Sequence, residues 1–194
     1  MSSPPQVILL DSNAYFRLAR TVHPLLAGTF SVNPSYSLYV LADLDTEYLT
    51  SSRLRSKFEW VNDMQHKTDR NAKRYQCRGK TKQPVDNAFS FLAAYAKSNS
   101  INVAPEDLRA LATGFARGFP VVTDDAGMKT IADAHSIECW SIIKLLKLML
   151  TTKKITQGKI TELLQYLDHE NDLPMGRKKL RALYQKYFGS KCPV

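Results

Sequence analysis

Hydrophobic positions alternate along most of the chain between short continuous apolar runs and longer stretches with helical spacing. The apolar runs at 6–10, 37–41 and 119–123 are short and end at polar residues, which predicts buried strands. Residues 137–140 are predicted to form a last short strand. Each of the first three runs is followed by an amphipathic helical pattern, and these patterns cover residues 14–20, 42–51 and 127–136. The alternation predicts strand–helix units.

Further helices are predicted over 86–98 and 105–118, where Pro105 suits a first helical turn and Gly118 a helix end. Residues 142–194 show helical patterns with a break at 172–174. Strand and helix patterns that alternate from residue 6 to about 145 predict an α/β three-layer sandwich with a mostly parallel twisted sheet flanked by helices. The expected organisation is a domain over 1–145, with a basic insertion at 65–84, and a helical C-terminal extension over 146–194 packed on the same domain.

Composition favours an ordinary globular protein: 194 residues, 44% of them hydrophobic and 23% charged. Cys77, Cys139 and Cys192 are odd in number and widely spaced, which fits neither a disulfide framework nor a zinc site and favours the reducing cytoplasm. Apolar runs fall short of the roughly 18–20 residues that span a bilayer, and the N-terminus lacks the pattern of a signal peptide. A soluble cytoplasmic protein with no membrane partner is therefore expected.

Acidic residues follow two of the predicted strands at their carboxyl ends. Asp11 comes directly after 6–10, and Asp124 and Asp125 follow 119–123. In parallel sheets ligands bind beyond the carboxyl ends of the strands. Each acid alone could instead cap the helix that follows it, which is a frequent use of Asp.

Two further acids lie on predicted helices: Glu47 after SLYVL, and Asp107 in the first turn of PEDLRALATGFARG. Together with VILLDSNAYF and VVTDDAGMKTIADAHSIECW, they occur in an order that resembles the PIN-domain (PilT N-terminus-like) nucleases, and most of all bacterial toxin-type PIN ribonucleases. The resemblance covers residues 6–145. It implies a catalytic and metal-binding set of Asp11, Glu47, Asp107 and Asp125, with Asp43 and Asp45 as alternatives to Glu47.

Four clustered carboxylates suit hard divalent cations, since Mg²⁺ and Mn²⁺ prefer oxygen ligands and keep several waters. One or two such ions would polarise a phosphate and activate water. Asn13, Thr123 and Asp124 are expected to hydrogen-bond the ligands from outside. The resemblance thus implies a metal-dependent endoribonuclease that hydrolyses RNA phosphodiester bonds.

Residues 65–84 carry seven basic side chains against one acid, a local charge of 7 − 1 = +6. One interpretation is an inserted loop that grips the RNA backbone, with Tyr75 stacking on an unpaired base. The alternative is a solvated flexible loop. The basic residues are Lys67, Arg70, Lys73, Arg74, Arg78, Lys80 and Lys82.

Residues 144–194 carry eleven basic residues against four acids, a net charge of 11 − 4 = +7. Over 176–189, apolar residues share one helical face with basic residues around it, which fits core or homodimer packing and an anionic partner. Because many bacterial PIN proteins are toxins paired with a small antitoxin, the resemblance implies such a partner, and the basic flank fits either an acidic antitoxin or nucleic acid.

Two rival functions remain open from sequence alone. A catalytically silent PIN-like domain could act as an RNA-binding or protein-assembly module, although it would not need all four acids. A phosphoacceptor domain of the receiver type also gathers Asp at strand ends, but it needs an acidic pair after the first strand, where this chain has only Asp11. The chain also lacks a P-loop and a strand-borne GxGxxG, which disfavours an ATPase or a dinucleotide enzyme.

Overall fold

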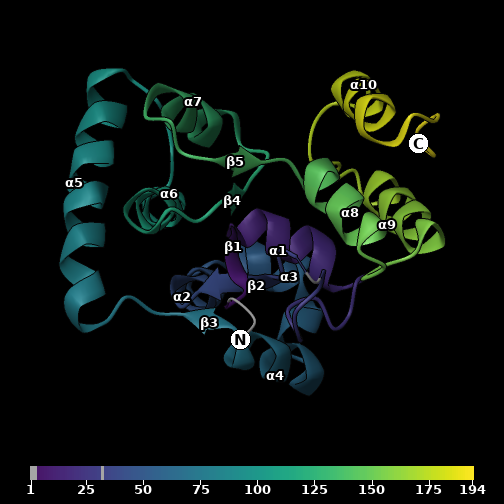
Figure 1. The fold of residues 1–194 in the computed structure, drawn as a ribbon, viewed down its shortest axis with the longest axis horizontal. Coiled ribbons are helices and arrows are strands. Elements are labelled where there is room, and N and C mark those ends of the chain that lie inside the picture. Colours follow the sequence, from purple (N-terminus) through teal and green to yellow (C-terminus); the bar gives the residue numbers. More distant parts are fainter. Residues whose placement is uncertain (1–3, 32) are drawn as a thin grey trace.

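A computed structural model describes residues 4–31 and 33–194, and a five-stranded sheet lies at its centre (Figure 1). The strand order is β3-β2-β1-β4-β5, and every pair of neighbouring strands is parallel. The predicted α/β class with a parallel sheet is confirmed. The strands are β1 (Gln6–Leu10), β2 (Tyr36–Leu41), β3 (Arg74–Tyr75), β4 (Val121–Val122) and β5 (Cys139–Trp140).

Helices fill most of the remaining chain. The predicted helices are present, although α5 begins at Lys82 rather than at Asp86. Pro105 opens α6 and Gly118 ends it in a left-handed conformation (φ 66°). In the described part of the chain, no helix has both the length and the apolar character to cross a membrane. The helices are α1 (Ser12–Ala19), α2 (Asp43–Thr50), α3 (Ser52–Lys57), η1 (Glu59–Asn62), α4 (Met64–Ala72), η2 (Gly79–Thr81), α5 (Lys82–Ser98), α6 (Pro105–Arg117), α7 (Ala126–Ala134), α8 (Ile142–Thr151), α9 (Gln157–His169) and α10 (Arg177–Phe188).

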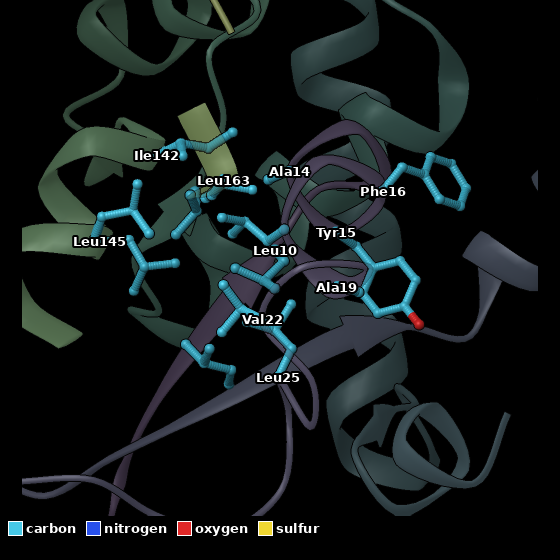
Figure 2. Packing of buried hydrophobic residues seen from close by; sticks show 14 of the residues in the cluster. Leu10, Ala14, Tyr15, Phe16, Ala19, Val22, Leu25, Ile142, Leu145 and Leu163 are labelled. Atoms are coloured by element: carbon cyan, nitrogen blue, oxygen red, sulfur yellow. The ribbon is translucent and has the colours of Figure 1, made fainter. Parts of the chain in front are cut away.

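The sheet separates two hydrophobic cores, because successive side chains of a strand point to opposite faces. On β1, Leu10 belongs to a core with α1 and the C-terminal helices, whereas Leu9 belongs to a core with α5, α6 and α7. Figure 2 shows Leu10 together with Ile142 and Leu163, which come from α8 and α9. The C-terminal helices therefore share one core with the sheet.

The topology places the ends of β1 and β4 side by side. The chain builds outward from β1 through β2 to β3 and then returns to the other side of β1, where Leu10 pairs with Val122. The Asp11 amide donates to the Val122 carbonyl at 3.1 Å. Strand order reverses at this point, which is where open α/β sheets bind their ligands. Asp11 and the residues after Val122 thus meet at the switch point.

Gly114 in α6 lies where the helix approaches β4 most closely. A Cβ atom there would lie 2.5 Å from Val121 Cγ2 and 2.9 Å from the Phe119 carbonyl oxygen. We expect Gly114→Ala to lower the free energy of unfolding by about 1–3 kcal/mol in urea denaturation, because the overpacked helix must shift. Gly158→Ala on the exposed start of α9 is the control, since its Cβ would meet only Thr156 Oγ1 at 3.9 Å. Equal effects of the two substitutions would contradict the prediction.

Candidate functional site

Asp11 links the end of β1 to the start of α1. Its Oδ1 accepts a hydrogen bond from the Ala14 amide at 2.5 Å and so caps α1, which is the helix-capping role that the sequence also allowed for this residue. Its Oδ2 is buried and has no hydrogen-bond partner among the described residues. Burial raises the pKa of Asp11 to about 6, while the Thr123 hydroxyl and the Ala14 amide act in the opposite direction. One carboxylate oxygen of Asp11 is therefore available to a ligand.

Asp125 and Asp124 follow β4, and the structure gives them different environments. Asp125 is exposed and caps α7 by accepting from the Met128 amide at 2.8 Å. The Asp124 side chain is fully buried, where it pairs with Lys129 Nζ at 2.9 Å and accepts from the Ile142 amide at 3.1 Å. Asp125 can still offer an oxygen to a ligand, whereas Asp124 holds α7 and α8 in place.

Glu47 is the half-buried acid of α2. Its Oε2 is buried and has no hydrogen-bond partner among the described residues. Burial raises its pKa, the charge of Glu106 adds to this effect, and the Ser12 side chain lowers the pKa. Of the alternatives, Asp45 pairs with two arginines and Asp43 is exposed. The geometry therefore disfavours Asp45, whereas Asp43, which lines one recess with Asp11 and Asp107, stays an alternative to Glu47.

Asp107, in the first turn of α6, lies among the other acids. Its pKa is raised to about 7, first by burial and then by the negative charges of Asp11, Glu47, Asp125 and Glu106. With Asp11 and Glu106, it lines a narrow recess at the carboxyl edge of the sheet. The structure thus places all four predicted acids in one negatively charged region, and it adds Glu106. Sequence showed Glu106 only as the neighbour of Asp107 in a helical first turn, where the helix dipole favours any acid.

The donor set of this region suits a hard divalent cation, because carboxylate oxygens are its preferred ligands and two of them are buried without partners. In residues 4–31 and 33–194, however, no group of three or more His, Cys, Asp or Glu side chains is arranged to hold an ion by itself. Water and phosphate oxygens would have to complete the coordination. That pattern is common for Mg²⁺, which is usually held by one or two carboxylates together with waters and substrate phosphates.

The three residues predicted to support the ligands have separate outcomes. Thr123 is buried, and its hydroxyl accepts from the Asp125 amide at 3.1 Å, which positions that acid. Asp124 acts through the helix contacts already described. Asn13 is exposed, and its role stays a prediction.

The prediction that residues 65–84 form an inserted loop is wrong. They contribute to α4, the edge strand β3, η2 and the start of α5. Tyr75 packs edge-on against Tyr39 and Phe119 as part of β3. Asp69 accepts from the Leu25 and Leu26 amides at 3.0 Å each, which anchors an earlier loop to α4. The segment is integral to the domain.

Several of its cations are therefore structural. Arg70 is 3% exposed and donates to Tyr15 and Asp45, so its assignment to RNA binding is corrected. Lys73 donates to Ser37 Oγ at 2.8 Å. Arg74 and Lys82 are paired with acids, namely Asp45 and Asp86. Exposed positions in the segment, where contact with an RNA backbone stays a prediction, are Lys67, Arg78, Lys80 and Lys82.

Comparison with known proteins finds no matching family model and no matching curated protein. Among solved structures, the chain is similar to FitAcB from Neisseria gonorrhoeae, with a TM-score of 0.46 and 16% identity, over 70% of this chain and 97% of that one. It is also similar to VapBC-5 from Mycobacterium tuberculosis, a member of the VapBC family of toxin–antitoxin systems, with a TM-score of 0.43 and 17% identity, over 71% and 99%. Both likenesses are weak, so the function proposed below depends on the carboxylate geometry.

Proposed function

We propose that the protein is a metal-dependent endoribonuclease that hydrolyses RNA phosphodiester bonds at Asp11, Glu47, Asp107 and Asp125. The observation that carries the proposal is the pair of buried, unpartnered carboxylate oxygens, Asp11 Oδ2 and Glu47 Oε2, within a region of like charge. Unpaired buried charge is costly unless a proton or a cation compensates it. A bound cation would allow all four acids to ionise together.

Mg²⁺ or Mn²⁺ would be held by the available oxygens of these four side chains, with one or two ions. When bound, it would polarise the scissile phosphate and lower the pKa of a bound water. Because Asp11 and Asp125 cap α1 and α7, both helices begin at the site, and α6 begins beside it at Pro105. The positive ends of these helix dipoles would favour a phosphate there. The chain itself thus orients the anion toward the acids.

The decisive experiment is cleavage of a mixed cellular RNA pool by purified protein with Mg²⁺ or Mn²⁺ against EDTA. We expect metal-dependent cutting that disappears in an Asp11→Asn/Asp125→Asn double variant. Asn caps helices as well as Asp does, so α1 and α7 should keep their starts while the charge is lost. Asp133→Asn is a control on the exposed surface of α7 and should cut like wild type. Equal cutting by the double variant and wild type would refute the assignment.

The alternative is a catalytically silent module that binds RNA or assembles with a protein. One observation favours it: among the residues that the structure describes, no three acids are arranged to hold an ion by themselves. If wild type and the double variant are equally inert but both bind RNA, this alternative replaces the nuclease.

We also propose that the nuclease acts as the toxin of a toxin–antitoxin pair with an acidic antitoxin. Exposed basic residues along α10 support an acidic partner; among them are Lys178, Lys179 and Lys186. Induced expression of wild type in a bacterial host should arrest growth, and the Asp11→Asn/Asp125→Asn variant should not. Growth that is equal in both strains would remove the toxin role and leave the nuclease to the cleavage assay. A homodimer stays a prediction, which light scattering would test.

A further inference from the structure

A second and larger cavity adjoins the carboxylate recess. It has a volume of about 500 Å³ and lies between the ends of β2 and β3 and the helices α2, α5 and α6. Leu41, Asp43 and Glu106 line both spaces, so the two are continuous along one wall. The volume falls within the range of about 300–1,000 Å³ that is typical of small-molecule sites. A group bound in this cavity would lie next to the proposed reaction centre.

Flat groups form part of the cavity wall. Phe89 from α5 and Tyr75 from β3 supply aromatic surface, and the Arg109 guanidinium lies 4.5 Å from the centroid of the Phe89 ring. Arg109 is held there by Asp86, which accepts from its Nη1 at 2.6 Å. Gln76 and Thr46, which are exposed, supply polar groups that can hydrogen-bond the edge of a planar ligand. The wall therefore offers both planar stacking surfaces and hydrogen-bonding groups.

The formal charges around the cavity cancel. Three basic residues face three acids, and Asp86 pairs with two of those bases, Lys82 and Arg109. A phosphate site would need an excess of positive charge, so the balance favours a neutral planar ligand with polar edges. The basic residues are Arg78, Lys82 and Arg109, and the acidic residues are Asp43, Asp86 and Glu106.

We propose that this cavity binds one unpaired nucleobase that flanks the scissile phosphate. The inference rests on the proposed function, because RNA at the carboxylate recess would place a neighbouring nucleotide here. The base would stack on the Phe89 and Arg109 pair, as unpaired bases stack on aromatic rings and guanidinium planes in RNA-binding proteins. A base inside a duplex cannot enter, so the substrate is RNA that is single-stranded at the cleavage point.

Cys77 provides a reporter inside the cavity. Of the other two thiols, Cys192 is 6% exposed, and burial raises the pKa of Cys139 to about 12, so both should react slowly with an alkylating agent. Alkylation of Cys77 by iodoacetamide, followed by mass spectrometry, would be measured in EDTA with each of the four nucleoside 5′-monophosphates. At about ten times Kd, a protecting nucleotide should slow the reaction about tenfold, because the unliganded fraction falls by that factor.

Ribose 5-phosphate at the same concentration separates the base from the phosphate and should give no protection. Phe89→Ala should abolish protection by the nucleotides, whereas Phe91→Ala, an exposed aromatic of the same helix outside the cavity, should preserve it. If Phe89→Ala does not fold, Thr46→Trp serves instead, because the new side chain fills the cavity from an exposed position. The rate of Cys77 alkylation in this variant should not depend on the nucleotides. Equal protection by ribose 5-phosphate, or protection by none of the nucleotides, would overturn the proposal.

The assay also separates this proposal from the nuclease proposal, since it requires neither metal nor turnover. If the nucleotides protect Cys77 but the protein does not cut RNA, the nuclease proposal fails and the base site stands. Cleavage without protection would keep the nuclease and refute the base site.

Discussion

Asp107→Asn stabilises the metal-free protein at pH 8 by about 1–2 kcal/mol while it abolishes the metal-dependent cleavage. The substitution keeps the size of the side chain but removes a charge that burial and four neighbouring acids oppose. The loss of activity follows because the same charge is needed to hold a cation. Urea denaturation in EDTA and RNA cleavage with Mg²⁺ measure the two effects on one preparation.

The pH dependence of this effect has a definite sign. The pKa of Asp107 is raised from 3.8 to about 7, so the native state binds the proton more tightly than the unfolded state does. Protonation therefore adds stability that is complete below about pH 4 and is lost as the pH rises through 7. A shift of this size corresponds to at most about 4 kcal/mol, and solvent around the partly exposed carboxyl reduces it to the expected 1–2 kcal/mol. At pH 4 the variant should gain nothing.

Two controls isolate the charge from general effects of substitution. Asp133→Asn on exposed α7 should change stability by less than about 0.5 kcal/mol at either pH. Mg²⁺ should stabilise wild type more than Asp107→Asn, because a ligand that binds only the native state stabilises it by RT ln(1 + [L]/Kd), which grows as Kd falls. Stability of Asp107→Asn equal to wild type at pH 8 in EDTA would show that the acids do not repel one another in the native state.

The carboxylate region could be predicted from the sequence because its geometry follows from strand ends. Asp11 and Asp125 each follow a short apolar run, and parallel strands bring such residues to one edge. Helical spacing predicts Asp107 in the first turn of a helix, but the sequence does not show which other acids lie near it in space. The pairing of β1 with β4, which brings Asp11 and Asp125 together, depends on contacts about 110 residues apart that no local pattern records.

The basic segment could not be predicted correctly, because sequence does not show which cations are buried. Lys67 and Arg70 look alike as members of a charge run, yet one is exposed and the other is buried in the domain. What distinguishes them is the position of Asp45 and Tyr15, which meet Arg70 only after the sheet has formed. The same limit applies to the 500 Å³ cavity, whose walls come from five separate elements.

Arg70→Ala should lower the free energy of unfolding by about 3 kcal/mol, with little direct effect on RNA affinity in the fraction that remains folded. Arg70 donates to Asp45 Oδ1 at 3.0 Å, to the Tyr15 hydroxyl at 3.1 Å and to the Val61 carbonyl at 2.8 Å. Its removal takes this donor from the buried Tyr15 hydroxyl and Val61 carbonyl, while Asp45 keeps Arg74 as a partner. Urea denaturation measures the loss of stability, and fluorescence anisotropy with a labelled single-stranded RNA measures the affinity.

Arg74→Ala is the matched control, since Arg74 pairs with the same carboxylate, Asp45, from a more exposed position. The Arg74 side chain is 31% exposed against 4% for Arg70, so its removal should cost less than about 1 kcal/mol. A combined Lys67→Ala/Arg78→Ala/Lys80→Ala variant, whose positions are exposed, should instead weaken RNA binding and flatten its salt dependence without loss of stability. If Arg70→Ala and Arg74→Ala are equally mild, Arg70 does not anchor the domain; if the triple variant binds RNA like wild type at every salt concentration, the segment has only a structural role.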